Sequence, residues 1–231
     1  MRRFLVAGMS ALWIGWMGGC AQTRPLADLP DPIFETARQA RLQRVPAPVH
    51  PGRIAGPKRA GSPYHTAPGW IPPGGIRPRW TCVVIHHSAS ETGGAETFDR
   101  YHRNVRNWDE LGYHFVIGNG SDTGDGEIEV GSRWTKQKRG AHCKTPDNYY
   151  NEHGIGICLV GNFTHHPPTP AQMDSLARLI SFLMRACGID VSRVRTHRGV
   201  TGRTECPGAR FSLARLKTRL EPGVAAVNHA G

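Results

Sequence analysis

From Trp80 onward the sequence predicts an α/β domain of roughly 150 residues, in which strands and helices alternate. Residues 82–85 form a short apolar run that ends in valine and isoleucine, and residues 153–163 form a longer apolar run that contains glycines. Runs of this kind are typical of buried strands, and glycines within them mark places where another group approaches closely. Residues 169–188 show the apolar periodicity of an amphipathic helix.

The helix over 169–188 has clear signals at both ends. Thr169 is a good N-cap, Pro170 suits the first helical position, and Gln172 completes a capping box. Gly188 is a typical helix stop. An apolar stripe is expected to face the core, and it consists of Met173, Leu176, Ala177, Ile180, Leu183, Met184 and Cys187.

The elements between these segments are shorter. Residues 95–108 predict a helix with an apolar face made by Phe98, Tyr101, Val105 and Trp108. Residues 112–118 alternate like a strand, and residues 126–130 are expected to pair with them as a hairpin. A short helix over 212–220 is expected to close the domain.

The first 20 residues predict a secretory signal segment. Two arginines are followed by an apolar run without charge, which is too short for a spanning helix. The small residues before Cys20 resemble a bacterial lipobox, in which that cysteine is lipidated. An ordinary signal peptide and an uncleaved anchor are the alternatives. Each of the three places the rest of the chain outside the cytoplasm, and the first makes it a membrane-anchored lipoprotein of a bacterial envelope.

Residues 21–79 predict a Pro-rich tether, since they hold 12 of the 18 prolines of the chain. The predicted domain covers residues 80–222, and a flexible tail is expected over 223–231. The formal net charge is +11, which suits an anionic partner such as a cell-wall polymer. No block of basic residues is interleaved with aromatic ones, so nucleic acid is not an expected partner.

Three residues suggest a metal site. His86 ends the first predicted strand, His197 follows the short strand-like stretch SRVRT, and Cys206 comes nine residues later. Two histidines and a thiolate can hold Zn²⁺ and leave the fourth tetrahedral position to water. Spacing alone leaves open that the histidines are ordinary hydrogen-bonded residues and that Cys206 is structural.

Four stretches together resemble the zinc-dependent N-acetylmuramoyl-L-alanine amidases, a family that includes phage lysozyme-type amidases and peptidoglycan recognition proteins. They are VVIHHSAS, WDELGYHFVIG, RGAHCKTPDNYYNEHGIGICLVGNF and THRGVTGRTECPG, in this order. The resemblance runs from about Trp80 to Leu216. It implies a mixed central β-sheet flanked by helices, in a single catalytic domain.

The resemblance also implies roles for particular residues. The zinc ligands of the family match His86, His197 and Cys206, while His87 matches a variable position. Tyr113 matches a catalytic tyrosine. Thr204 matches a second catalytic position, which holds lysine in phage enzymes and often threonine in recognition proteins. A related subfamily uses a glutamate on the strand that reads GIGICLVG here, and this strand has no acid.

Substrate contacts are expected from His142, which matches a histidine lining the cleft, and from Trp108 and Trp134, because sugars and peptides favour aromatic walls. Core packing is the alternative for Trp108. The cysteines at 82, 143, 158 and 187 allow two disulfides in three connectivities, and no pairing is predicted.

The sequence thus predicts a Zn²⁺-dependent hydrolase that cleaves the amide between N-acetylmuramic acid and the L-alanine of the peptidoglycan stem peptide. The alternative is a non-catalytic module that binds muropeptides, as in recognition proteins that lack the cysteine ligand. A third and weaker alternative is an assembly adaptor. Peptidoglycan is the expected partner in the first two cases.

Overall fold

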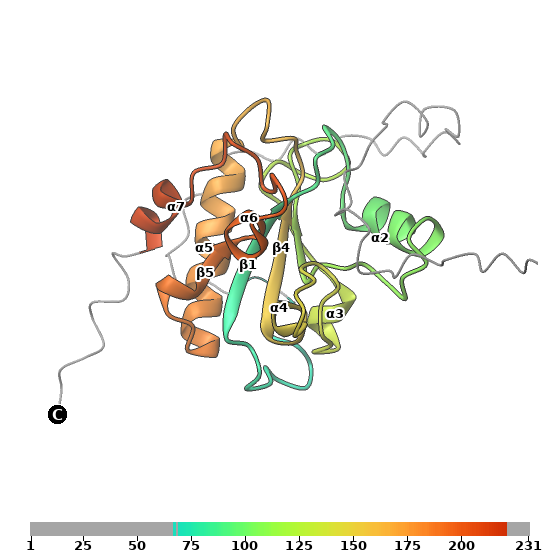
Figure 1. Cartoon of the computed structure of the whole chain (residues 1–231), viewed down its shortest axis with the longest axis vertical. Helices are drawn as coiled ribbons and strands as arrows, with labels where there is room; N and C mark the ends of the chain where they lie inside the picture. The colour runs from blue at the N-terminus through green and yellow to red at the C-terminus, as the bar shows by residue number, and fades with distance from the viewer. Residues whose placement is uncertain (1–66, 68, 221–231) are drawn as a thin grey trace, which may run out of the picture.

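The computed structural model describes residue 67 and residues 69–220. Within this part, a five-stranded sheet lies between helices on its two faces (Figure 1). The predicted signal segment 1–20 with Cys20, most of the predicted tether and the predicted tail 223–231 lie outside the described residues. No helix of the described part is both long enough and apolar enough to span a bilayer.

The sheet is mixed, as expected, with the strand order β3-β2-β4-β1-β5. The strands β2, β4, β1 and β5 run parallel to one another, and β3 pairs antiparallel with β2 as the predicted hairpin partner. The strands are β1 (Cys82–His87), β2 (Phe115–Ile117), β3 (Ile128–Val130), β4 (Gly154–Leu159) and β5 (Val194–Thr196).

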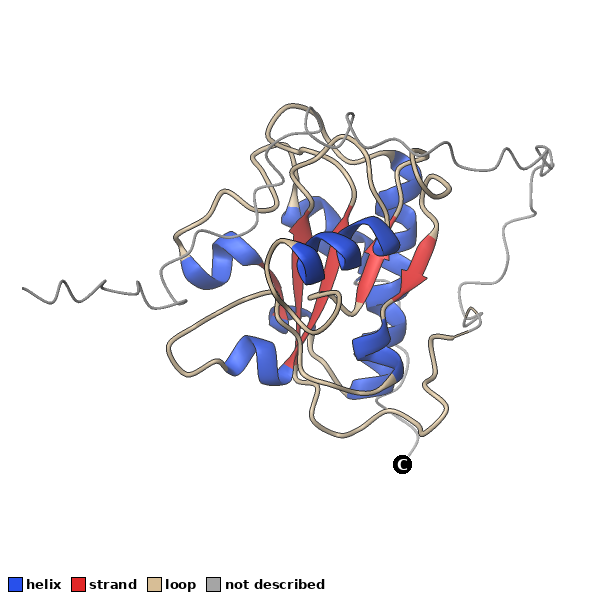
Figure 2. Cartoon of the chain, turned by 90° about the vertical axis from the view of Figure 1, so that its right-hand side faces the viewer, coloured by secondary structure: helices blue, strands red, loops and turns tan. Residues whose placement is uncertain are grey.

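Helices cover both faces of the sheet, as the views in Figures 1 and 2 show. Helices α5 and α7 pack together on one face, and α2 lies on the other. Shorter helices connect the strands. The helices are α2 (Ala95–Asn104), α3 (Ser132–Thr135), α4 (Tyr149–His153), α5 (Pro170–Cys187), α6 (His197–Thr201) and α7 (Leu213–Leu220).

The long helix α5 forms as its sequence predicts. The Thr169 hydroxyl accepts a hydrogen bond from the Gln172 N–H at 3.0 Å, and the Gln172 side chain accepts one from the Thr169 N–H. Gly188 ends the helix in the left-handed conformation, with φ of 68°. The buried face is wider than predicted, because it also contains Leu179 and Phe182. This face packs on the odd-numbered side chains of β1 and β4, which form the main core.

Helix α2 is shorter than predicted. It ends at Asn104, and the chain then turns through Asn107, whose φ is 56°. Val105 is therefore 64% exposed instead of lying on the buried face. Trp108 leaves the helix altogether and stacks on the ring of His102, with the ring centroids 4.6 Å apart. The helix was predicted too long because apolar residues at helical spacing continue to Trp108, beyond the end of the helix at Asn104.

One expectation about an aromatic residue needs correction. Trp134 is fully buried and packs on Phe115 and Trp80 in the main core, so it cannot line a substrate groove. Trp70 is only 4% exposed, lies 5.3 Å from the ring of Phe182 and belongs to the same core. The packed domain thus includes residues from the segment predicted as tether.

The loop between α2 and β2 is held by a buried charge cluster. The Glu110 carboxylate is buried and accepts hydrogen bonds from Ser132, Lys136 and Lys138. Next to it, the buried Arg133 guanidinium bonds the Leu111 carbonyl and pairs with Asp109. Burial would raise the pKa of Glu110, but these donors outweigh it and lower the pKa to about 2.

We expect Glu110→Gln to destabilise the domain by roughly 2 kcal/mol at pH 7. The folded-state pKa of Glu110 lies below its ordinary value of 4.5. The stabilisation is therefore present above about pH 5 and is lost as the pH falls toward 2. Denaturant unfolding of both proteins between pH 7 and pH 3 measures the difference. The exposed Glu96→Gln is the matched control, and a gap between wild type and Glu110→Gln that did not narrow on acidification would contradict the expectation.

Candidate metal centre and active site

The predicted ligands meet at one edge of the sheet. The parallel strands β1 and β5 end side by side, and His86 lies near the end of β1 while His197 directly follows β5 as the first residue of α6. Cys206 comes from the loop after α6. The carboxyl ends of parallel strands are where open α/β sheets commonly bind ligands.

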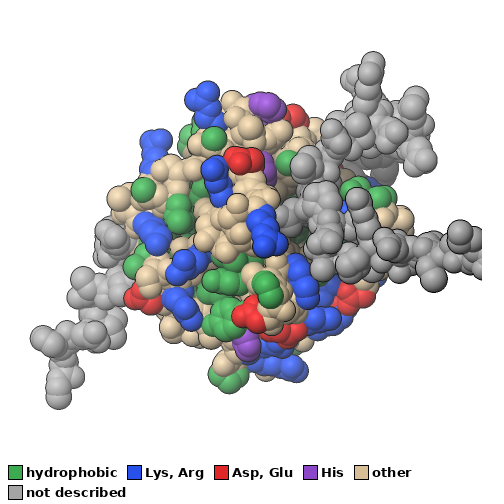
Figure 3. All heavy atoms as spheres, viewed as in Figure 1, with side chains coloured by type: hydrophobic (Ala, Val, Ile, Leu, Met, Phe, Trp, Pro, Cys, Tyr) green, Lys and Arg blue, Asp and Glu red, His purple; other side chains and the backbone are tan. Residues whose placement is uncertain are grey.

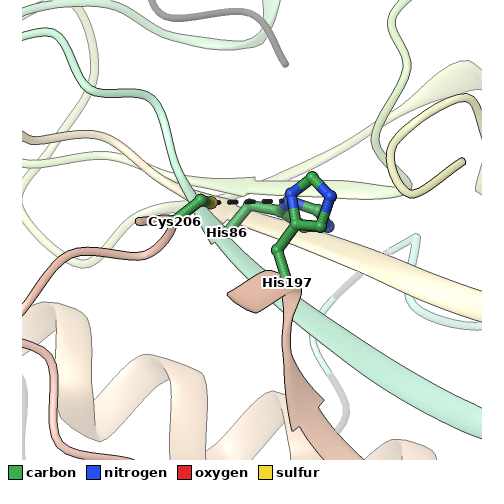
Figure 4. A group of neighbouring side chains, drawn as sticks. All are labelled: His86, His197 and Cys206. Atoms are coloured by element: carbon green, nitrogen blue, oxygen red, sulfur yellow. Dashed lines mark hydrogen bonds between the residues drawn. The ribbon is translucent and has the colours of Figure 1, made fainter. Parts of the chain in front are cut away.

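The three side chains point toward one another (Figure 4). One potential ligand atom from each of them lies within 4.8 Å of the others, and all three residues are buried. The Cys206 Sγ is 3.7 Å from the Nδ1 of His86, and the rings of His86 and His197 are 4.6 Å apart. This is the one such group of His, Cys, Asp and Glu in the described part of the chain.

Strand alternation explains why His86 and not its neighbour belongs to the site. Successive side chains of β1 point to opposite faces of the sheet. His87 therefore faces the main core, where its Nδ1 accepts a hydrogen bond from the Phe163 N–H at 3.1 Å. Burial lowers the pKa of His87 to about 4. This contact agrees with the expectation that His87 is not a ligand.

Local hydrogen bonds fix the segment that carries the other two ligands. Thr196 caps α6 through its hydroxyl, which accepts from the Gly199 N–H. The Arg198 N–H donates to the Cys206 carbonyl at 2.8 Å and brings the loop back to the helix. The Cys206 sulfur also accepts a hydrogen bond from the His87 N–H at 3.4 Å.

Tyr113 lies beside the three-residue cluster. Its ring centroid is 5.2 Å from that of His86 and the residue is buried, in a small core with Phe98 and Val116. Its hydroxyl is hydrogen-bonded to the thiol of Cys158, which is paired in register with His86 on the next strand. The structure thus brings Tyr113 to the cluster, as the sequence predicts.

Thr204 is partly exposed and lies next to the cysteine. Its hydroxyl oxygen accepts a hydrogen bond from the Cys206 N–H at 3.1 Å. Trp108 is partly exposed and contacts His102, whose ring is 5.7 Å from that of Tyr113. The ring of His102 therefore lies between Trp108 and Tyr113. The contact of Trp108 with substrate stays a prediction.

His142 lies in direct contact with the three-residue cluster. It is 6% exposed, and both of its ring nitrogens have partners within the protein. Its Nδ1 lies 3.1 Å from the Nε2 of His86, and its Nε2 lies 3.2 Å from the Gly154 carbonyl oxygen. These contacts favour a role in supporting His86 over the predicted contact with substrate.

Glycines make the space for the His142 ring. A Cβ atom on Gly156 would lie 2.4 Å from Cδ2 of His142, and one on Gly140 would lie 2.3 Å from the same atom. The glycines of the 153–163 strand were expected to mark a close approach, and the ring of His142 makes it. The sequence signal was present, but the approaching group could not be named from it.

We expect Gly156→Ala to destabilise the domain by about 1–3 kcal/mol, because the methyl group overlaps the His142 ring in a packed interior. Urea unfolding measures the change. Gly74→Ala is the control, since a Cβ atom there meets nothing within 4 Å. Equal stability of Gly156→Ala and Gly74→Ala would show that the His142 ring is not confined by this strand.

Histidine 114 was not singled out by sequence reasoning. Its Nδ1 accepts from the Gly156 N–H at 2.9 Å, and its Nε2 lies 3.1 Å from the Lys138 carbonyl oxygen. Burial lowers its pKa to about 3, so it is neutral at pH 7.

The five described cysteines are free, and four of them, including Cys143 and Cys158, are buried. No disulfide therefore forms among the described residues.

Comparison with known proteins gives a consistent result. The profile of the N-acetylmuramoyl-L-alanine amidase family matches residues 77–209. The N-acetylmuramoyl-L-alanine amidase of Mus musculus is 30% identical over 149 residues, which are 58% of this chain and 25% of the mouse protein. Peptidoglycan-recognition protein SC2 of Drosophila melanogaster is 31% identical over 134 residues, which are 54% of this chain and 67% of that protein.

A solved structure shares the fold. The endolysine N-acetylmuramoyl-L-alanine amidase LysCS from Clostridium intestinale superposes with a TM-score of 0.53 and 31% identity, over 62% of this chain and 84% of that one. The matched part of the chain spans only a quarter of the length of the mouse relative. The similarity therefore concerns the domain described above.

Proposed function

Because the chain belongs to the N-acetylmuramoyl-L-alanine amidase family, we propose that it is a zinc-dependent amidase of peptidoglycan. The bond cleaved is the amide between the lactyl group of N-acetylmuramic acid and the L-alanine of the stem peptide. The observation that carries the proposal is the convergence of His86, His197 and Cys206 on one point.

The residues present fit Zn²⁺. Typical Zn–S and Zn–N bonds in tetrahedral geometry place the sulfur and nitrogen about 3.5 Å apart. The distance between the Cys206 Sγ and the His86 Nδ1 is 3.7 Å. Burial and the neighbouring histidines keep the pKa of His86 well below its usual value, so its ring is neutral and offers a lone pair. We assign His86, His197 and Cys206 as the ligands.

Zn²⁺ held by these three residues would act as a Lewis acid that activates water and polarises the carbonyl to be attacked. The chain's own groups act around this centre. The hydroxyl of Tyr113, whose ring centroid is 5.2 Å from that of His86, is assigned to orient the water and donate a hydrogen bond to the developing oxyanion. The Thr204 hydroxyl accepts from the Cys206 N–H, and its own hydrogen is left to donate to the substrate. Preorganised donors of this kind contribute roughly 3–4 kcal/mol each.

The charge distribution suits an anionic wall. Residues 175–220 contain ten lysines and arginines but only two acids, and all of these basic residues except Lys217 are exposed. They are spread over the surface formed by α5, β5, α6 and α7 (Figure 3). Positive surfaces accelerate encounter with polyanions without requiring a specific contact. This supports action on peptidoglycan, whose stem peptides carry carboxylates.

The alternative is a module that binds muropeptides without cleaving them, since relatives of this chain are named both amidases and recognition proteins. The presence of Cys206 favours the enzyme. Zinc content of the purified protein and release of stem peptides from purified sacculi decide between the two. Stoichiometric zinc with peptide release supports the amidase, whereas binding to sacculi without release would establish the module.

The proposed site of action is outside the cytoplasm, where peptidoglycan lies. Membrane attachment through a lipid on Cys20 remains a prediction from the lipobox-like segment. Metabolic labelling with a radioactive fatty acid tests it, and Cys20→Ala should abolish the label. Label retained in the variant would exclude that cysteine as the attachment site.

A further inference from the structure

We propose that His142 is a positioning residue that fixes the tautomer of His86, and that the Gly154 carbonyl fixes the tautomer of His142 in turn. The predicted role of His142 was contact with substrate. The inferred role is different, because it presents the correct nitrogen of His86 to the metal. The effect that we expect on zinc affinity rests on the proposed function. The assignment of the two tautomers does not depend on it.

The chain of hydrogen bonds begins at an atom that can only accept. The Gly154 carbonyl oxygen lies 3.2 Å from the Nε2 of His142, so this nitrogen must carry the proton. The buried ring of His142 lies against a carbonyl oxygen and a second imidazole, and neither of these carries a negative charge that would hold the ring in its cationic form. A neutral imidazole has one N–H, and the Nδ1 of His142 is therefore a lone pair.

A second hydrogen bond, between His142 and His86, determines which nitrogen of His86 carries the proton. The Nδ1 of His142 lies 3.1 Å from the Nε2 of His86, which must therefore donate. An imidazole that donates from Nε2 can bind a metal only through a lone pair on Nδ1, and in His86 this atom faces the Cys206 sulfur at 3.7 Å. The main-chain carbonyl of one strand thus determines which nitrogen of a ligand on the neighbouring strand is free to bind a metal.

The ring that transmits the constraint is held in place. The Asn151 Oδ1 accepts hydrogen bonds from the N–H groups of both His142 and Cys143, each at 2.8 Å. The ring lies against Gly140 and Gly156, where even a methyl group would overlap it. The backbone and the ring of His142 are thus fixed from separate sides. A clamped ring is what a positioning role requires.

Metal-bound histidines commonly donate their second N–H to a fixed acceptor, and loss of that acceptor typically costs 10–100-fold in metal affinity. The usual acceptor is a carboxylate, a carbonyl or water. Here the acceptor is a second histidine. We therefore expect His142→Leu to bind Zn²⁺ about 10–100-fold more weakly. His142→Gln should stay within about threefold of wild type, because its amide can accept from His86 and donate to Gly154.

The test combines two measurements. Long-range ¹H–¹⁵N spectra of the metal-free protein report which nitrogen of each imidazole is protonated, and the expected result is protonation at Nε2 for both His86 and His142. Competition with a chelator measures Zn²⁺ affinity for wild type, His142→Leu and His142→Gln. His102→Gln is the control, since it removes another buried imidazole, one that accepts a hydrogen bond from the Gly112 N–H.

Protonation of His86 at Nδ1 in the wild-type protein overturns the proposal, and so does unchanged zinc affinity in a folded His142→Leu protein. If His142→Leu does not fold, the wild-type spectrum and the His142→Gln protein still test the proposal. A tenfold lower zinc affinity in a folded His142→Gln protein would show that His142 does not act as the hydrogen-bond acceptor of His86. A wild-type protein that binds no zinc overturns the proposed function instead, and the spectrum then still tests the hydrogen-bonded chain.

Discussion

Cys206→Ser is expected to lose bound zinc and amidase activity together, with activity falling on the order of 10³-fold or more. A serine hydroxyl stays protonated at neutral pH and is a poor ligand for Zn²⁺, so only two imidazoles would remain. The Cys206 sulfur also accepts the His87 N–H at 3.4 Å, and a hydroxyl can accept the same bond. The fold should therefore survive the change while the metal does not.

The matched control is Cys187→Ser. This residue is a partly buried thiol near the end of α5, on the opposite face of the sheet, and the change removes a sulfur without touching the proposed ligands. Zinc content, melting temperature without metal and release of peptide from sacculi should be measured for all three proteins. An active Cys206→Ser protein without metal would contradict the proposed mechanism.

Tyr113→Phe is expected to lower kcat about 10²–10³-fold while leaving zinc affinity unchanged. The substitution removes one hydroxyl and keeps the ring, which packs in a small core with Phe98 and Val116. The position of that hydroxyl is set by its loop. The Leu111 N–H donates to Asp99 at 2.6 Å, so the segment before Tyr113 is tied to α2.

Tyr150→Phe is the control for this prediction, since it removes a hydroxyl from a partly exposed tyrosine of α4. Initial rates on a soluble muropeptide separate kcat from KM, and chelator competition reports the metal. A fall in zinc affinity would mean that Tyr113 supports the ligands, and an unchanged kcat would remove it from the proposed mechanism.

Much of the fold could be predicted because its signals are local. Helix α5 has a capping box, a proline at its first position and a terminal glycine, and all of them act within a few residues of the chain. The runs 82–85 of β1 and 154–159 of β4 contain no charged residue, because both faces of these strands are covered. Helices α3 and α4, with four and five residues, escaped prediction because they are too short to show a period.

The predictions that were wrong share one cause. The stripe from Phe98 to Trp108 has helical spacing, but the chain turns after Asn104 because Trp108 stacks on His102. Trp134 has the character of a groove residue, yet it is fully buried beside Phe115. In each case the packing of an aromatic side chain against another ring, which the local spacing does not show, decided the outcome.

The amino-acid sequence by itself determined the α/β class and the long helix, because these depend on residue types and short spacings, and its four family-like stretches indicated the family and the three clustered residues. Only the tertiary structure decided that His86 and Cys206, 120 residues apart, face each other, and that His142 turns toward His86. The physical reason is that a hydrogen bond has a donor and an acceptor side. The Gly154 carbonyl can only accept, and the missing side chain of Gly156 leaves room for the His142 ring, so folding sets which nitrogen of His142 and of His86 carries the proton.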